Sequence, residues 1–246
     1  MRAFKSLLVT TAIAGLLAAM SVRLFALPLP SLSGPWAPGE MRAGQSKLVN
    51  PLNTTDYITV DWIVLYDSVG VWGYPGSFVY MYQLENTAGS SGIRAFNVKY
   101  GGAQGNNDEI GIKAGDLDAN NPPLWSGHNS TNFGNLSVET EPGGTPQGNL
   151  GNYNAFFPDP NSVSYTLSGI TISLGRESLV LYIIDPRAPT YGEAKAQDSA
   201  SWWGMVTLGG VTYGEPVPVP SPEPGMFMLL ATSLAGILVW QRRSKK

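Results

Sequence analysis

The fold is decided by Tyr57–Tyr66, which reads YITVDWIVLY, and by Phe78–Leu84, which reads FVYMYQL. Both stretches are rich in β-branched and aromatic residues and alternate between two faces, as β-strands do. One face of the first stretch carries Ile58, Val60, Trp62 and Val64, and one face of the second carries Phe78, Tyr80, Tyr82 and Leu84. These two stretches therefore predict neighbouring strands with a large apolar face.

Further short runs of the same kind follow, each bounded by glycine, asparagine or proline. They are Ala95–Tyr100, Ile110–Ala114, Ser162–Leu167, Ile170–Leu174, Leu179–Ile184, Trp202–Leu208 and Val211–Tyr213. No capped helical pattern of useful length interrupts this part of the chain. The pattern predicts an all-β domain, a β-sandwich of the immunoglobulin-like or jelly-roll-like kind.

One long segment, residues 101–161, breaks the rhythm of strands. It holds eleven glycines, eleven asparagines and six prolines, with only brief apolar runs. A structureless segment of this length in a compact domain is usually functional or poorly ordered. We interpret it as a loop insertion between the two halves of the sandwich.

Composition excludes several classes of chemistry. The chain has 246 residues, no cysteine, one histidine (His128) and a formal net charge of −3. It therefore has no disulfide scaffold, no thiol nucleophile, no cysteine-bound zinc and no multi-histidine metal cage. The acidic balance argues against a nucleic-acid partner.

The N-terminal segment has the pattern of an export signal. Arg2 and Lys5 give it a positive start, and Ser6–Met20 is uncharged and mostly apolar. That run is short for a spanning helix and suits the core of a signal peptide. We therefore expect residues 1–26 to be a signal peptide, with an uncleaved anchor as the alternative.

The C-terminal segment has the pattern of a membrane anchor. Every second residue from 216 to 224 is proline, which predicts a stiff, extended linker. We expect the exported domain to consist of residues 27–215, before this linker. Gly225–Trp240 is uncharged, and a basic cluster follows it: Arg242, Arg243, Lys245 and Lys246. We expect residues 225–246 to be a transmembrane helix with a basic tail that stays on the cytoplasmic side.

Pro222-Glu223-Pro224, an apolar segment and a terminal basic cluster occur here in the order of a PEP-CTERM sorting signal. The C-terminus thus resembles that of proteins which Gram-negative bacteria export together with an exopolysaccharide matrix. The resemblance implies that exosortase, a membrane-embedded processing enzyme, recognises Pro222, Glu223 and Pro224 and cuts the chain near them. It also implies passage through the inner membrane, then the cell surface or the extracellular matrix. An ordinary single-pass anchor after a proline-rich stalk is the alternative.

Two internal stretches resemble elements of PEP-CTERM cargo domains as well. FVYMYQLENTAGSSGIRAFNVKY (78–100) contains Glu85-Asn86-Thr87 between two strand patterns, and LGRESLVLYIIDPRAPTYGEA (174–194) resembles a later strand. These likenesses support the all-β fold and imply little about biochemistry.

The net charge divides unevenly along the chain. Seven of the fifteen lysines and arginines lie in the terminal segments, and none of the eighteen acidic residues does. The exported portion therefore has eight basic and eighteen acidic residues, a formal charge of −10. Such acidity opposes adhesion to anionic polymers unless cations bridge them.

The sequence offers little support for an enzyme. A serine hydrolase would depend on His128, which lies in the loop sequence WSGHN, and no Gly-x-Ser-x-Gly elbow is present. Two carboxylates brought together by folding could hydrolyse glycosides, but most acidic residues lie in turn contexts. We therefore expect no enzymatic activity and keep a secreted hydrolase as the least favoured alternative.

A weak calcium motif lies within the long insertion. Asp116, Asp118 and Asn120 place oxygen ligands at every second position, as in the first half of a calcium loop. Gly127 stands where a bidentate glutamate is needed, so an ordinary acidic turn is the favoured interpretation. No other cofactor is expected.

Aromatic residues near predicted loops are candidate sugar contacts, because pyranose rings stack on aromatic faces. They are Trp72, Tyr74, Trp125, Trp202 and Trp203. The last two are adjacent in a predicted strand, so one side chain points inward and the other outward.

These patterns predict an exported protein of the cell envelope or extracellular matrix with a structural or adhesive role. A module that binds exopolysaccharide is the alternative. Outward aromatics on one sheet would favour that module, two facing carboxylates in a cleft would favour the hydrolase, and a smooth surface would favour a purely structural protein.

Overall fold

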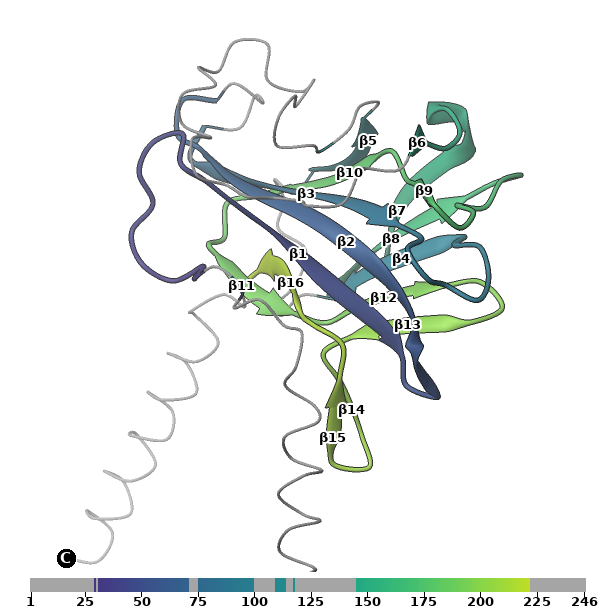
Figure 1. The fold of residues 1–246 in the computed structure, drawn as a ribbon. Helices are drawn as coiled ribbons and strands as arrows, with labels where there is room; N and C mark the ends of the chain where they lie inside the picture. The colour runs from purple at the N-terminus through teal and green to yellow at the C-terminus, as the bar shows by residue number, and fades with distance from the viewer. Residues whose placement is uncertain are drawn as a thin grey trace, which may run out of the picture. The chain divides into compact units, whose positions relative to one another are not determined.

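The computed structural model describes residues 29, 31–70, 75–99, 109–113, 117 and 145–221. Almost all regular structure in these residues is β-strand, which confirms the all-β prediction (Figure 1). The strands are β1 (Met41–Asn50), β2 (Asn53–Asp67), β3 (Ser77–Glu85), β4 (Ala95–Lys99), β5 (Glu109–Lys113), β6 (Thr145–Pro146), β7 (Tyr153–Asp159), β8 (Ser162–Leu167), β9 (Arg176–Glu177), β10 (Val180–Asp185), β11 (Pro189–Gly192), β12 (Ala194–Gln197), β13 (Ser201–Gly204), β14 (Val206–Leu208), β15 (Val211–Tyr213) and β16 (Val217–Pro220). A 3₁₀ turn, Leu150–Asn152, precedes β7.

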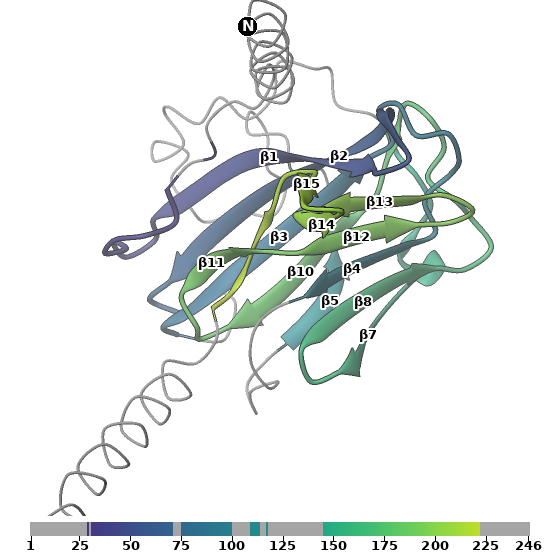
Figure 2. The ribbon, with the colours of Figure 1, turned by 90° about the horizontal axis from the view of Figure 1, so that it is seen from below.

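One continuous sheet folds over into two layers and nearly closes into a barrel (Figures 1 and 2). The first layer has the strand order β5-β10-β3-β2-β1, and the second continues as β13-β12-β4-β8-β7. The layers join where Val49 of β1 pairs with Trp203 of β13. The two ends of the path, β5 and β7, lie beside each other. The domain therefore has one core enclosed by a single sheet.

Large aromatic and branched side chains fill the space between the layers. Trp62 and Tyr82 are cross-strand partners in the first layer, and both are fully buried. Phe96 of the second layer lies 5.7 Å from Tyr82 between ring centroids and 6.3 Å from Tyr165. The Tyr165 hydroxyl donates a 2.7 Å hydrogen bond to the Tyr182 carbonyl of the first layer. This hydrogen bond offsets the cost of removing the Tyr165 hydroxyl from water.

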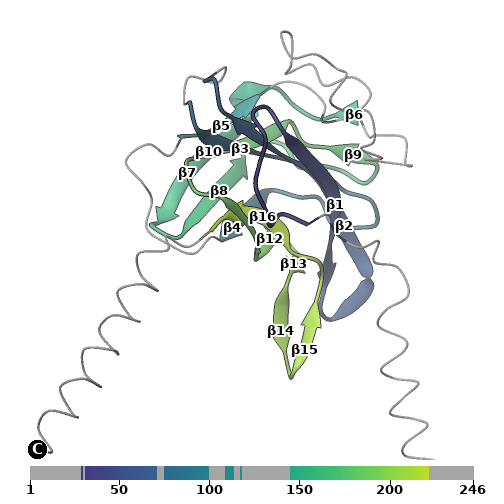
Figure 3. The same ribbon diagram turned by 90° about the vertical axis from the view of Figure 1, so that its left-hand side faces the viewer.

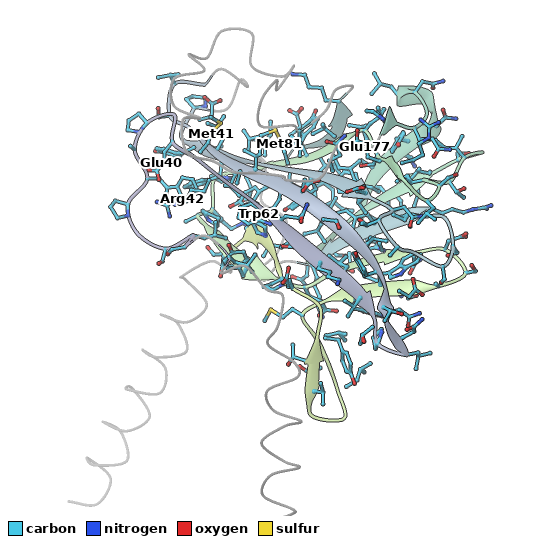
Figure 4. All side chains as sticks on the ribbon, in the orientation of Figure 1. Glu40, Met41, Arg42, Trp62, Met81 and Glu177 are labelled. Atoms are coloured by element: carbon cyan, nitrogen blue, oxygen red, sulfur yellow. The ribbon has the colours of Figure 1, made fainter. Side chains whose placement is uncertain are left out.

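The first layer is buried on its other face too. Ile63, Leu65, Val79 and Met81 lie on the side opposite Trp62, and each is at most 1% exposed. Leu117 packs with them, and its N–H donates a 2.6 Å hydrogen bond to the Gln83 side chain. Figure 4 labels Trp62 and Met81, which lie on these two faces. Burial on both faces explains why the runs Trp62–Leu65 in β2 and Phe78–Tyr82 in β3 are continuously apolar.

The structure corrects the prediction that residues 101–161 form a loop. Glu109–Lys113 are β5 at one end of the sheet, and Tyr153–Asp159 are β7 at the other. The strand run predicted at Ile110–Ala114 is confirmed by β5 to within one residue. In β7, Asn154 and Pro158 interrupt the apolar pattern, and pairing with β8 decides the strand.

The predicted linker at residues 216–224 is also wrong in its first half. Val217–Pro220 form β16, whose residues are all buried and which pairs with β11. The Tyr82 hydroxyl donates a 2.6 Å hydrogen bond to the Pro218 carbonyl. Alternating prolines suit this edge ribbon, because the valines between them supply the backbone N–H groups. The domain therefore extends to Ser221.

Two predicted strands have different bounds or pairing in the structure. The run Trp202–Leu208 divides at Met205, whose φ of 60° ends β13 and starts the β14–β15 hairpin seen at the bottom of Figure 3. The run Ile170–Leu174 contributes only the isolated bridge between Ile172 and Ile93.

The predicted signal segment (1–26) and transmembrane segment (225–246) lie outside the described residues. Within the described ranges, no helix has the length and apolarity needed to span a membrane.

Candidate functional site

Most sequence-predicted site residues lie outside the part of the chain that the structure describes. These are the sugar candidates Trp72, Tyr74 and Trp125, the calcium candidates Asp116, Asp118 and Asn120, the sorting residues Pro222, Glu223 and Pro224, the basic cluster, and His128. Within the described ranges, no group of three acidic or histidine side chains is placed to hold a metal ion. Trp202 and Trp203 are the sugar candidates whose positions the structure defines.

Trp202 is a core residue, so its assignment as a sugar contact is wrong. It is 0% exposed, and its Nε1 donates a 2.6 Å hydrogen bond to Asp56. The other partners of this carboxylate are Asn50 (2.9 Å) and the backbone N–H and hydroxyl of Ser90 (2.8 and 2.6 Å). Burial acts to raise the pKa of Asp56, but hydrogen bonds from Ser90, Asn50 and Trp202 outweigh it and lower the pKa. This network joins β13 to β1, to β2 and to the segment between β3 and β4, and it buries the Trp202 side chain.

Trp203 points the other way, onto the outer face of the second layer. Its cross-strand partner on β12 is Lys195, and the Lys195 Nζ lies 4.4 Å from the centroid of the indole ring. Trp203 is half-buried, which leaves part of the ring accessible. The prediction that adjacent tryptophans face opposite sides is confirmed.

A shallow open groove of about 610 Å³ starts at Trp203 and crosses the second layer. It is lined by polar and charged side chains that include Asn97, Lys99, Asp159, Asn161, Glu193, Lys195 and Gln197. The lining comes from all five strands of the layer, from β13 to β7, and from the turns next to them. An indole ring beside amide side chains can contact an apolar face of a ligand while the amides bind its hydroxyl groups.

The charges in the groove balance one another. The Lys99 Nζ lies 3.5 Å from Glu193 Oε2. Asp159 accepts hydrogen bonds from the Ser162 hydroxyl (2.6 Å) and the Asn161 N–H (2.8 Å). These two bonds, with a smaller contribution from Lys99, lower the pKa of Asp159.

Such a carboxylate does not suit acid catalysis. The general acid of a glycosidase needs a raised pKa so that it holds a proton near neutral pH. Asp159 instead has a lowered pKa, so it does not have the property that such an acid needs.

A second, more apolar depression of about 410 Å³ lies on the other side of Trp203. Its lining includes Pro51, Leu52 and Leu208. Leu52 is 96% exposed at the β1–β2 turn. Trp203 thus borders a polar groove on one side and an apolar surface on the other.

Sequence reasoning missed Asn97, Lys99, Asp159 and Lys195 as site residues. The alternation of Ala95–Lys99 was a usable signal, because it places Asn97 and Lys99 on the face opposite Phe96 and Val98. Nothing local, however, indicates that this face lies beside Trp203, which is about a hundred residues further along the chain.

Comparison of the chain with protein-family models, curated proteins and solved structures found no match.

Proposed function

We propose that this chain is an exported, non-enzymatic protein of the cell envelope or extracellular matrix, whose β domain adheres to polysaccharide. The observation that carries the adhesive role is Trp203, an outward indole at the end of a polar groove. The apolar face of a sugar suits the indole ring, and its hydroxyl groups suit the amides beside the ring.

The sorting route is supported by the two terminal segments. Residues 1–26 act as the signal peptide, and residues 225–246 act as a membrane helix in the inner membrane with a cytoplasmic basic tail. Exosortase recognises Pro222, Glu223 and Pro224, as the PEP-CTERM resemblance implies. The described fold is complete by Ser221, so a cut in this motif removes no residue of the described core.

Sorting is tested in the producing bacterium with the double variant Glu223→Ala, Pro224→Ala. We expect the wild-type protein from the surface and medium to have lost Gly225–Lys246, and the variant to accumulate in the membrane with its full mass. Ser221→Ala is the matched control, because the backbone bond from its N–H to the Ala188 carbonyl is retained. A mature wild-type protein that keeps its C-terminal tail would show that the segment is a plain anchor.

Adhesion is tested by co-sedimentation of the full chain, in detergent, with exopolysaccharide from the producing bacterium. We expect Trp203→Ala to raise the apparent Kd from the binding isotherm about tenfold, which corresponds to about 1.4 kcal/mol. Trp36→Ala is the control, because Trp36 lies under the Arg42 guanidinium at 4.0 Å and against Phe78 of the first layer. Trp36 is thus a second indole ring that contacts a cationic side chain, but it lies away from the groove. Equal binding by the wild type and Trp203→Ala would contradict the proposal.

A further inference from the structure

The outer face of the second layer carries a continuous cross-strand row that begins at Trp203. Its members are paired in register from β13 to β7: Trp203, Lys195, Asn97, Ser164 and Phe156. Directly paired residues of antiparallel strands place their side chains on the same face. Phe156, at the far end, is 40% exposed. The half-buried Trp203 ring and the exposed Phe156 ring therefore stand at the two ends of this row, and Ser164 between them is 5% exposed.

The dimensions of this row suit an extended glycan. Neighbouring strands are about 4.8 Å apart, so the four steps from β13 to β7 cover about 19 Å. One strand spacing is close to the length of one pyranose unit along an extended chain. A polysaccharide that lies across the strands can thus place about one sugar over each strand, with sugar faces on the two aromatic rings.

The charges and amides of the groove indicate that the ligand is uncharged. Lys99 is engaged by Glu193, and the Lys195 ammonium lies over the Trp203 ring. By contrast, the side-chain amides of Asn97 and Gln197 make no hydrogen bond to another group in the described part of the chain. An amide offers both donors and acceptors, which matches a hydroxyl group better than a carboxylate. The acidic surroundings further disfavour an anionic chain.

We infer that the groove binds an uncharged, extended polysaccharide that lies across the strands from Trp203 and reaches Phe156, which stands on β7 outside the lining of the groove. This inference depends on the proposed adhesive function and names the class and direction of its ligand. Sugar hydroxyls are held by Asn97 and Gln197, and the two lysines stay paired within the protein.

The class of ligand is tested by isothermal titration calorimetry on the full chain in detergent. The probes are linear hexasaccharides: neutral ones of glucose, mannose, xylose and N-acetylglucosamine, and anionic ones of galacturonate and mannuronate. We expect a neutral probe to bind at least about tenfold more tightly than either anionic probe, with little change on raising the salt concentration. The double variant Asn97→Ala, Gln197→Ala should weaken that binding about tenfold, and Trp36→Ala should not.

The direction of the ligand is tested with di-, tetra- and hexasaccharides of the probe that binds. We expect Trp203→Ala to weaken binding of all three lengths, and Phe156→Ala to weaken only the longer two. Equal effects of Phe156→Ala on all lengths, or none, would overturn the crossing direction. Trp203-dependent binding that is confined to anionic probes would overturn the uncharged class but leave adhesion standing. Failure of every probe, together with failure of co-sedimentation, would reject the adhesive function itself.

Discussion

Trp202 and Trp203 show how neighbouring residues take different roles within one strand. Trp202 points into the core and binds Asp56 at 2.6 Å, whereas Trp203 points to the groove and contacts Lys195. The alternation of β-strands makes this division inevitable, but it does not say which tryptophan is inside. The inner position goes to Trp202 because Asp56 provides a partner for its N–H in the interior.

Removal of the Asp56 carboxylate should be costly. Asp56→Ala leaves the Trp202 N–H and the Ser90 N–H without their acceptor, so we expect a loss of about 3 kcal/mol in the free energy of unfolding. Urea titration at pH 7 measures this loss. Asp198→Ala, which breaks an exposed pair with Arg94 at 3.3 Å, should change the free energy of unfolding by about 0.5 kcal/mol or less.

The same variant has a pH signature. The pKa of Asp56 is lower in the folded chain than in the unfolded chain, where it is about 3.9. Its stabilising contribution is therefore present above pH 4 or so and is lost as the pH falls through the lowered folded pKa. Asp56→Ala should lose less stability than the wild type on acidification. Parallel curves of stability against pH would show that the ionised carboxylate is not what holds the network.

Asn86 explains why the sequence Glu85-Asn86-Thr87 stands out. Its side chain is fully buried, and Nδ2 donates bonds of 2.9 Å to the carbonyls of Ser91 and Ile172. Its Oδ1 accepts a 3.0 Å bond from the Gly89 N–H. One asparagine thus shapes the β3–β4 turn and ties it to the segment before β9, which is a structural role.

At the scale of elements, β16 is the clearest departure from expectation. The sequence VPVP predicts a linker, because proline cannot donate to a sheet. In the structure, Val217 and Val219 are buried, and the strand pairs with β11 next to the core residue Tyr82. Ser46 also donates a 2.6 Å hydrogen bond to the Pro216 carbonyl. These long-range hydrogen bonds hold the proline-rich segment against the domain as its last described strand.

The effect of truncating a valine in β16 on the free energy of unfolding shows whether this segment is part of the folded domain or a linker. We expect Val219→Ala to lower the free energy of unfolding by about 2 kcal/mol, because the side chain is 1% exposed and leaves a cavity. Val211→Ala, at a 44% exposed position in β15, should change it by less than about 0.5 kcal/mol. Denaturation in guanidinium chloride provides both values. A loss for Val219→Ala as small as the one expected for Val211→Ala would mean that Val219 in β16 does not stabilise the domain.

At the scale of the whole molecule, the two layers share one sheet and one core. The path passes from β1 to β13 without a separate linker, and Tyr165 of one layer binds the Tyr182 carbonyl of the other. The inner face of each layer is buried by packing against the other layer. We therefore expect the domain to unfold as a single cooperative unit.

Hydrogen exchange followed by mass spectrometry tests this cooperativity. The most protected amides of β3 and of β8, one strand from each layer, should give free energies of opening that agree within about 1 kcal/mol. A second layer that opens at a clearly lower free energy would show that the layers are separate folding units.

Several elements of the fold could be predicted because their signals are local. The runs at Ser162–Leu167 and Val211–Tyr213 were predicted with their observed bounds, and those in β2, β3 and β10 to within a few residues. Their alternation depends only on successive side chains pointing to opposite faces. β7 was missed because Asn154 and Pro158 interrupt the apolar pattern, and pairing with β8 decides its conformation instead.

The all-β class, the strand alternation and the opposite orientation of Trp202 and Trp203 can all be read from the order of residues, because each follows from a period of two residues. The same order contains the terminal patterns on which the sorting proposal depends. Tertiary contacts, by contrast, make Val217–Pro220 a strand of the domain and bring Trp203, Lys195, Asn97 and Phe156 into one row. The register between strands distant in sequence is fixed by the shared core, and no local pattern of residues specifies it.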